Sequence, residues 1–91
     1  MSAVRRAFDG RTVLVTGAAG GLGRALALEF AASGARIVAL DRDEAGLDSL
    51  RAELEGRGTA CLAAACDVTD ATACRRAVAA GVERFGGLDV L

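Results

Sequence analysis

The feature that most constrains the fold is a change from strand to helix through a glycine-rich turn. Thr12–Thr16 (T-V-L-V-T) is a short β-branched and aliphatic run, which is typical of a buried strand. The next seven residues, Gly17-Ala18-Ala19-Gly20-Gly21-Leu22-Gly23, include four glycines. Apolar residues then recur at helical spacing from Gly21 to Ser33, and Gly34 is placed to end that helix.

The rest of the chain repeats the alternation of strand and helix. Further strands are expected at Arg36–Leu40, Thr59–Cys66 and Leu88–Leu91, with helices after Asp43 and over Asp70–Phe85. The side chains expected to face the sheet are Leu22, Ala25, Leu26, Phe30 and Ala32 in the first helix, Leu47, Leu50 and Leu54 in the second, and Ala71, Cys74, Val78 and Val82 in the third. The order βαβαβαβ predicts an α/β fold with a doubly wound parallel sheet that stops in its fourth strand.

The glycines of the turn meet separate backbone requirements. Gly17 suits a positive φ, Gly21 lets the chain approach a phosphate without a Cβ, and Gly23 permits close packing of helix on strand. The helix that begins here directs unpaired N–H groups and its positive dipole end at any ligand, so a pyrophosphate is expected. A P-loop is excluded because the chain has no lysine, and the glycines follow G-x-x-x-G-x-G rather than G-x-G-x-x-G.

Two acids follow the next two expected strands. Asp41 ends the second strand, where a carboxylate can accept hydrogen bonds from a ribose diol. Asp67 ends the third strand at the same edge of the sheet and can accept a hydrogen bond from an adenine amino group. The turn and the two acids together predict a site for adenosine diphosphate. The alternatives are that Asp41 is a simple turn acid and that Asp67 only organises its own turn.

The charge and cysteine content exclude several other functions. The eleven positive charges are all arginines, are balanced by twelve acids and form no basic stripe, so nucleic acid is not an expected partner. Three cysteines without histidine form no zinc-ligand pattern, and they favour a reducing cytoplasm and a role as small buried hydrophobes. No apolar run approaches the roughly 18 residues of a membrane span.

The motif T-G-A-A-G-G-L-G, with Asp41 and the pair Asp67-Val68, resembles the N-terminal half of the short-chain dehydrogenase/reductase family. The resemblance covers nearly the whole chain. It implies a Rossmann-type sheet, a nicotinamide dinucleotide and hydride transfer between that cofactor and an alcohol or carbonyl substrate. It also implies a pyrophosphate contact for the Leu22 N–H and an adenine contact for Asp67 and Val68. The predicted cofactor-binding residues are Gly17, Gly20, Gly21, Leu22, Gly23, Asp41, Asp67 and Val68.

The same positions predict NAD rather than NADP. A carboxylate at Asp41 repels a 2′-phosphate, and Gly20 stands where NADP-preferring relatives often carry a basic residue. Arg42 follows Asp41 directly and can soften that repulsion. NADP therefore stays as the less favoured cofactor.

The family's catalytic set is a serine, a tyrosine and a lysine, and the chain contains neither tyrosine nor lysine. No catalytic residue is therefore predicted. Residues 1–91 are expected to be a partial dinucleotide-binding domain, inactive alone and marginally stable because its sheet edge is unpaired, with a flexible N-terminus over residues 1–10. The parent protein is expected to be an NAD(P)-dependent oxidoreductase that forms homo-oligomers. The alternatives are a dinucleotide-binding sensor without chemistry and a fragment of an S-adenosylmethionine-dependent methyltransferase.

Overall fold

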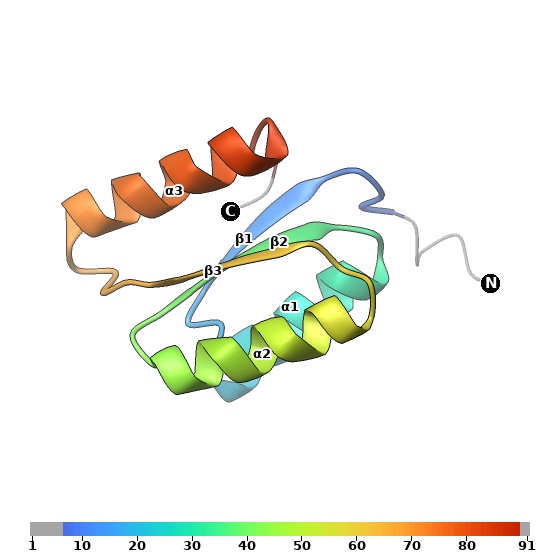
Figure 1. Cartoon of the computed structure of the whole chain (residues 1–91), viewed down its shortest axis with the longest axis horizontal. Helices are drawn as coiled ribbons and strands as arrows, with labels where there is room; N and C mark the ends of the chain where they lie inside the picture. Colours follow the sequence, from blue (N-terminus) through green and yellow to red (C-terminus); the bar gives the residue numbers. More distant parts are fainter. Residues whose placement is uncertain (1–6, 90–91) are drawn as a thin grey trace.

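The computed structural model describes residues 7–89, which form one three-stranded parallel sheet and three helices (Figure 1). The elements are β1 (Thr12–Thr16), α1 (Gly21–Ala32), β2 (Arg36–Asp41), α2 (Glu44–Gly56), β3 (Cys61–Ala65) and α3 (Ala71–Phe85). The strand β2 lies between β1 and β3. In this register Ile37 is paired with Val13 on one side and with Cys61 on the other.

The helices cover both faces of the sheet, with α1 and α2 on one face and α3 on the other (Figure 1). Successive side chains of a strand point to opposite faces, so a strand covered on both sides must be apolar throughout. In β2, Ile37 and Ala39 join the cluster that contains α1 and α2, whereas Val38 and Leu40 join the cluster with α3. The doubly wound Rossmann-type sheet predicted from the sequence is confirmed.

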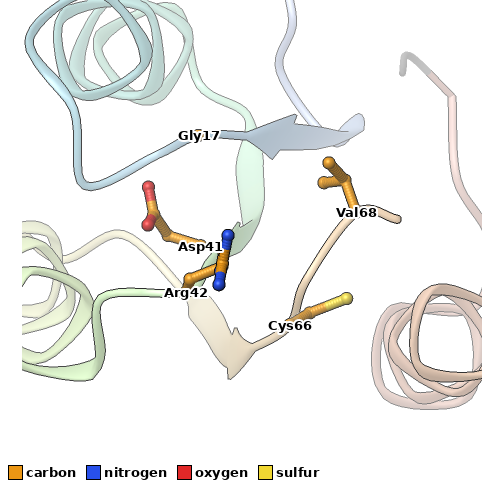
Figure 2. Close-up of a pocket in the computed structure, with 5 residues that line it drawn as sticks. All are labelled: Gly17, Asp41, Arg42, Cys66 and Val68. Atoms are coloured by element: carbon orange, nitrogen blue, oxygen red, sulfur yellow. The ribbon is translucent and has the colours of Figure 1, made fainter. Parts of the chain in front are cut away.

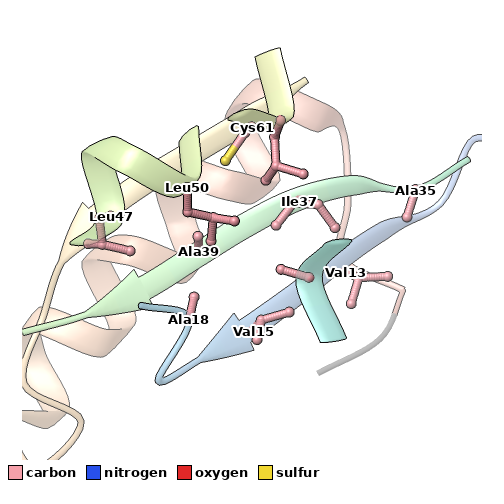
Figure 3. Close-up of a cluster of buried hydrophobic side chains, with 11 residues drawn as sticks. Val13, Val15, Ala18, Ala35, Ile37, Ala39, Leu47, Leu50 and Cys61 are labelled. Atoms are coloured by element: carbon pink, nitrogen blue, oxygen red, sulfur yellow. The ribbon is translucent and has the colours of Figure 1, made fainter. Parts of the chain in front are cut away.

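The larger core lies between the sheet and helices α1 and α2 (Figure 3). The prediction for α2 is confirmed, since Leu47, Leu50 and Leu54 are all buried. Cys61 also belongs to this cluster, while Cys66, which directly follows β3, belongs to the cluster on the α3 side.

The predicted inner face of α1 is wrong. Leu22 is 76% exposed and Leu26 43% exposed, whereas Ala27 is fully buried. The reason is the position of Gly23, because a Cβ there would lie 2.0 Å from the carbonyl oxygen of Gly17. This close approach holds Gly23 against the turn and directs the positions four and eight residues later, Ala27 and Ala31, toward the core. Of the predicted set, only Phe30 packs against the cluster.

The inner face of α3 differs from the prediction in a similar way. Ala77 and Gly81 are its buried residues, while Ala71 and Val82 are exposed. A Cβ at Gly81 would lie 2.9 Å from a methyl group of Val38, so this glycine allows α3 to lie close to β2. Of the predicted set, Cys74 and Val78 are half-buried and pack against the cluster on this face, as predicted. The buried residues of the helix, however, are the small ones.

Each end of the described chain contacts a different element. The N-terminal end lies against α1, and the C-terminal end lies against β1. Within the N-terminal segment expected to be flexible, Phe8 forms an edge-to-face pair with Phe30, with ring centroids 5.0 Å apart. Residues 1–6 lie outside the described residues. At the other end, the Asp89 N–H donates to the Thr12 carbonyl (2.9 Å), and its carboxylate accepts from the Thr12 N–H (2.8 Å).

Only the first half of the expected fourth strand lies within the described residues. Leu88 and Asp89 are not in a strand, and Val90 and Leu91 lie outside the described residues. The two bonds to Thr12 nevertheless run along the edge of β1 that faces away from β2, since the β2 edge is joined through the carbonyl of Arg11. A strand that continued from this point would extend the sheet beside β1, which corresponds to the strand order 3-2-1-4 of Rossmann folds.

Candidate functional site

The glycine turn leaves the end of β1 and returns directly into α1. Gly17 has a φ of +63°, a conformation that favours glycine, so the positive φ predicted for it is confirmed. The Ala18 N–H donates to the Leu40 carbonyl (3.0 Å), which joins the turn to β2. Gly23 is packed on the backbone of this turn, whereas no described atom lies within 4 Å of a Cβ built at Gly21. The open side of the turn is therefore at Gly21.

The N-terminus of α1 differs from those of the other two described helices. In α2 the Asp43 side chain accepts from the Gly46 N–H, and in α3 the Asp70 side chain accepts from the Thr72 and Ala73 N–H groups. The N-cap of α1 is Gly20, without a side-chain cap, and its first turn contains no acid. The first N–H groups of a helix have no acceptor within the helix. This end of α1 is thus left positive and available to an anion.

Asp41 connects the turn to the start of α2. One carboxylate oxygen accepts from the Ala19 N–H (3.0 Å) and the other from the Asp43 N–H (2.9 Å). The Asp43 N–H, which contributes most, and the Ala19 N–H hold the pKa of the Asp41 carboxyl below its ordinary value of 3.8, against a smaller opposing effect of burial. Asp41 is therefore charged at neutral pH, and it does organise a turn, the simpler of its two predicted roles.

These bonds predict a dependence of stability on pH. Because the pKa of Asp41 is lower in the folded than in the unfolded state, the ionised carboxylate stabilises the fold fully above about pH 3.8, and this contribution is lost as the pH falls through the lower folded value. Asp41→Asn retains only one side-chain acceptor for the two N–H groups. We expect the variant to be less stable than the natural protein at pH 6 and the difference to shrink at pH 3, measured by urea unfolding.

The control for this measurement is Asp48→Asn, which removes a carboxylate on α2 that lies 3.7 Å from Arg51. That variant should show a small difference at both pH values, because exposed ion pairs contribute little. A stability difference for Asp41→Asn that stayed the same between pH 6 and pH 3 would contradict the role assigned to the charge.

A pocket lies where the three strands end (Figure 2). Its lining residues are Gly17 after β1, Asp41 and Arg42 at β2, and Cys66 and Val68 after β3. Figure 2 shows Val68 across the pocket from Asp41, and the Val68 side chain is 56% exposed. The structure therefore brings together Gly17, Asp41 and Val68 from the predicted set.

Asp67 lies next to this pocket and organises its own turn. One carboxylate oxygen accepts from the N–H (2.9 Å) and from the hydroxyl (2.7 Å) of Thr69, and these bonds lower the pKa of Asp67. The other oxygen lies 3.8 Å from the Arg42 Nε. The predicted adenine contact of Asp67 stays a prediction.

Two residues outside the predicted set also line the pocket. The sequence analysis gives Arg42 only an influence on a 2′-phosphate and treats the cysteines as small buried hydrophobes, yet Arg42 and Cys66 both line the pocket. The signal was their position, since each is adjacent in sequence to a predicted strand-end acid. Outside the pocket, Arg24 pairs with Glu53 and joins α1 to α2.

Two further findings concern other kinds of site. Among residues 7–89, no group of three or more histidine, cysteine or acidic side chains is arranged to hold a metal ion. Within the same range, every helix is too short or too polar to cross a membrane.

The sheet, its two helical layers and the glycine turn at the first strand end define a Rossmann-type α/β protein. The sequence profile described as short chain dehydrogenase matches residues 11–91. The chain therefore belongs to the short-chain dehydrogenase family.

Individual relatives are similar to the chain over nearly its whole length. It is 45% identical over 84 residues to D-threitol dehydrogenase from Mycolicibacterium smegmatis, covering 92% of this chain and 32% of the relative. Carveol dehydrogenase from Mycobacterium avium in complex with NAD has a TM-score of 0.87 and 30% identity, covering 93% of this chain and 35% of that one. A short chain dehydrogenase/reductase from Burkholderia phymatum in complex with NAD has a TM-score of 0.88 and 31% identity, covering 91% and 30%. The chain thus spans about a third of the length of these relatives.

Proposed function

We propose that residues 11–91 form the adenosine and pyrophosphate half of an NAD site, in an oxidoreductase that transfers hydride between NAD and an alcohol or carbonyl substrate. The observation that carries the proposal is the positive, uncapped N-terminus of α1 beside the Asp41 carboxylate. Support for a nicotinamide dinucleotide comes from related structures that are in complex with NAD. Support for alcohol chemistry comes from relatives named as dehydrogenases.

Each part of the dinucleotide has a corresponding group in the chain. The pyrophosphate would bind the first N–H groups of α1, at Gly21 and Leu22, because Gly21 leaves room for it. The ribose diol would donate to the charged Asp41, and the adenine would lie against Val68, whose apolar side chain is exposed in the pocket. When bound, the nicotinamide supplies the hydride chemistry. No residue of this sequence is assigned a proton transfer, because the chain contains neither tyrosine nor lysine.

The preference for NAD over NADP follows from the charges at the ribose position. Asp41 is ionised at neutral pH, so a 2′-phosphate beside it would be repelled. Arg42 could offset that repulsion, but its Nε lies 3.8 Å from the Asp67 carboxylate. A 2′-phosphate would therefore have to compete with Asp67 for this cation.

The direct test is calorimetric titration of the complete protein that carries this sequence with NAD, ADP-ribose and S-adenosylmethionine. NAD and ADP-ribose are expected to bind, because both contain the adenosine and the pyrophosphate that the site recognises. S-adenosylmethionine contains adenosine without a pyrophosphate and should bind at least ten times more weakly, a difference of about 1.4 kcal/mol. Tighter binding of S-adenosylmethionine would overturn the proposal.

Gly21→Asp separates binding from folding. The new side chain enters open space, and an acid in the first turn of a helix is favourable by about 0.3–1 kcal/mol. The same charge would repel a pyrophosphate, so we expect unchanged or slightly raised stability and at least about tenfold weaker NAD binding. The control is Gly56→Asp at the far end of α2, where no described atom lies within 4 Å of the added Cβ. Unchanged NAD affinity in Gly21→Asp would count against the phosphate site.

A further inference from the structure

Cys66 and Cys74 form a close pair of thiols at the side of the pocket. Their sulfur atoms are 3.5 Å apart, although Cys66 directly follows β3 and Cys74 lies in the first turn of α3. Both sulfurs lie near the Asp67 carbonyl oxygen, at 3.6 Å for Cys66 and 3.8 Å for Cys74. Cys66 lines the pocket and is 5% exposed, whereas Cys74 is half-buried.

The third cysteine is isolated from this pair. Cys61 is fully buried in the cluster on the opposite face of the sheet (Figure 3). Burial raises its pKa to about 11, so little of the reactive thiolate is present at neutral pH. Cys61 therefore serves as an internal control for the chemistry of the other two.

We propose that Cys66 and Cys74 are a redox modification site, which closes to a reversible disulfide beside the adenosine end of the pocket. A disulfide has an S–S length of about 2.05 Å, so the two sulfurs need to approach by about 1.5 Å. The two residues are eight apart in sequence, and Asp67 and Val68 lie within the loop that the bond would close.

The oxidant is the disulfide of a small thiol, such as glutathione disulfide. The Cys74 thiolate, the more accessible of the two, attacks one sulfur of this disulfide, forms a mixed disulfide and releases one small thiol. The Cys66 thiolate then attacks the Cys74 sulfur and releases the second small thiol. The protein loses two protons and two electrons, and the small disulfide gains them. Excess small thiol reverses both steps.

The surroundings of Cys66 favour this order of reaction. Burial raises the pKa of Cys66, and so do the hydrogen bond and the charge of Cys74. Cys66 is thus the poorer first nucleophile. Once Cys74 is in a mixed disulfide, its part of the rise disappears, while burial and the charges of Asp70 and Asp67 continue to raise the pKa of Cys66.

The disulfide is expected to change the shape of the pocket. Figure 2 shows the Cys66 sulfur pointing away from Asp41, and Cys66 packs in the cluster of α3. Closing the gap between the sulfurs would draw residues 66–68 toward α3, away from Gly17 and Asp41. The adenosine end of the pocket would widen, so dinucleotide binding should weaken. This second part of the inference rests on the proposed function, whereas the disulfide does not.

The test of the disulfide uses the complete protein, glutathione disulfide and alkylation of the remaining thiols. Cleavage after Arg57 and Arg75 releases residues 58–75, which contain all three cysteines of this sequence. In the oxidised protein we expect this peptide to carry one alkyl group, on Cys61, and in the reduced protein three. Cys74→Ser and Cys66→Ser should prevent the bond. A peptide that stays fully alkylated, a stable mixed disulfide at Cys74, or a bond to Cys61 would overturn the proposal.

The effect on the pocket is measured as the Kd for NAD of the oxidised, reduced and Cys74→Ser proteins. We expect at least a threefold rise in Kd on oxidation of the natural protein, reversal by excess thiol, and no change in Cys74→Ser. Equal Kd values in a protein shown to hold the disulfide would overturn the effect on binding. If neither form bound NAD, the proposed function would fail, while peptide mapping would still decide whether the disulfide forms.

Discussion

Gly23→Ala is expected to lower the free energy of unfolding by at least about 3 kcal/mol, since the added methyl group meets backbone atoms that cannot move aside. A Cβ at this position would lie 2.0 Å from the Gly17 oxygen, 2.7 Å from the Gly17 carbonyl carbon and 3.1 Å from the Ala18 Cα. Relief would require α1 to shift away from the turn, which would expose Ala27 and the core beneath it. The measurement is urea unfolding followed by circular dichroism.

The matched control is Gly56→Ala at the end of α2. No described atom lies within 4 Å of a Cβ at Gly56, and its φ is not positive. The same substitution should therefore be neutral or stabilising by up to about 1 kcal/mol, the ordinary gain of alanine over glycine in a helix. Similar small effects in both variants would show that α1 does not depend on the close approach at Gly23.

Asp41→Ser is expected to lower the preference for NAD over NADP by about 100-fold. Loss of a hydrogen bond to a charged group costs about 1.5–3 kcal/mol, which weakens NAD binding, and removal of the charge lets Arg42 interact with a 2′-phosphate. The serine hydroxyl can still accept one of the two N–H groups that the carboxylate binds, so the turn retains part of its support. The ratio of the two Kd values, determined by titration, is the measurement.

Asp48→Ser is the control for this switch, because it changes the net charge equally at an exposed position of α2 outside the pocket. Its ratio of Kd values should match that of the natural protein. An unchanged ratio in Asp41→Ser would mean that Asp41 only organises the turn, which its bonds to Ala19 and Asp43 already show it to do. The ribose contact would then have to come from another residue.

Much of the fold could be predicted because its signals are local. The strand over Thr12–Thr16 is predicted to the residue, and the α2 leucines at spacings of three and four are buried as expected. Both patterns are strong because they record how a single element divides its apolar and polar side chains. The conformation of Gly17 is local as well, since a tight turn at the end of a strand requires a positive φ.

The faces of α1 and α3 could not be predicted in this way. The predicted sets contain exposed residues such as Leu22 and Val82, whereas the small residues Ala27, Ala77 and Gly81 are buried. Phe30 and Val78 are predicted large residues that do pack against the core clusters. A helix that packs closely on a sheet needs small residues at the contact, and hydrophobic spacing does not record that need. Leu22 and Leu26 are exposed, so these large residues do not mark the inner face of α1.

The sequence by itself determined the order of the six described strands and helices, the glycine turn, and the placement of Asp41 at the end of β2 and of Asp67 shortly after β3, because each depends on residues that are close along the chain. Only the tertiary structure decided how α1 is rotated, which N–H groups Asp41 accepts, and that Cys66 and Cys74 are 3.5 Å apart. These features depend on contacts between elements. Distances across such contacts are set by packing, which no local pattern in the sequence specifies.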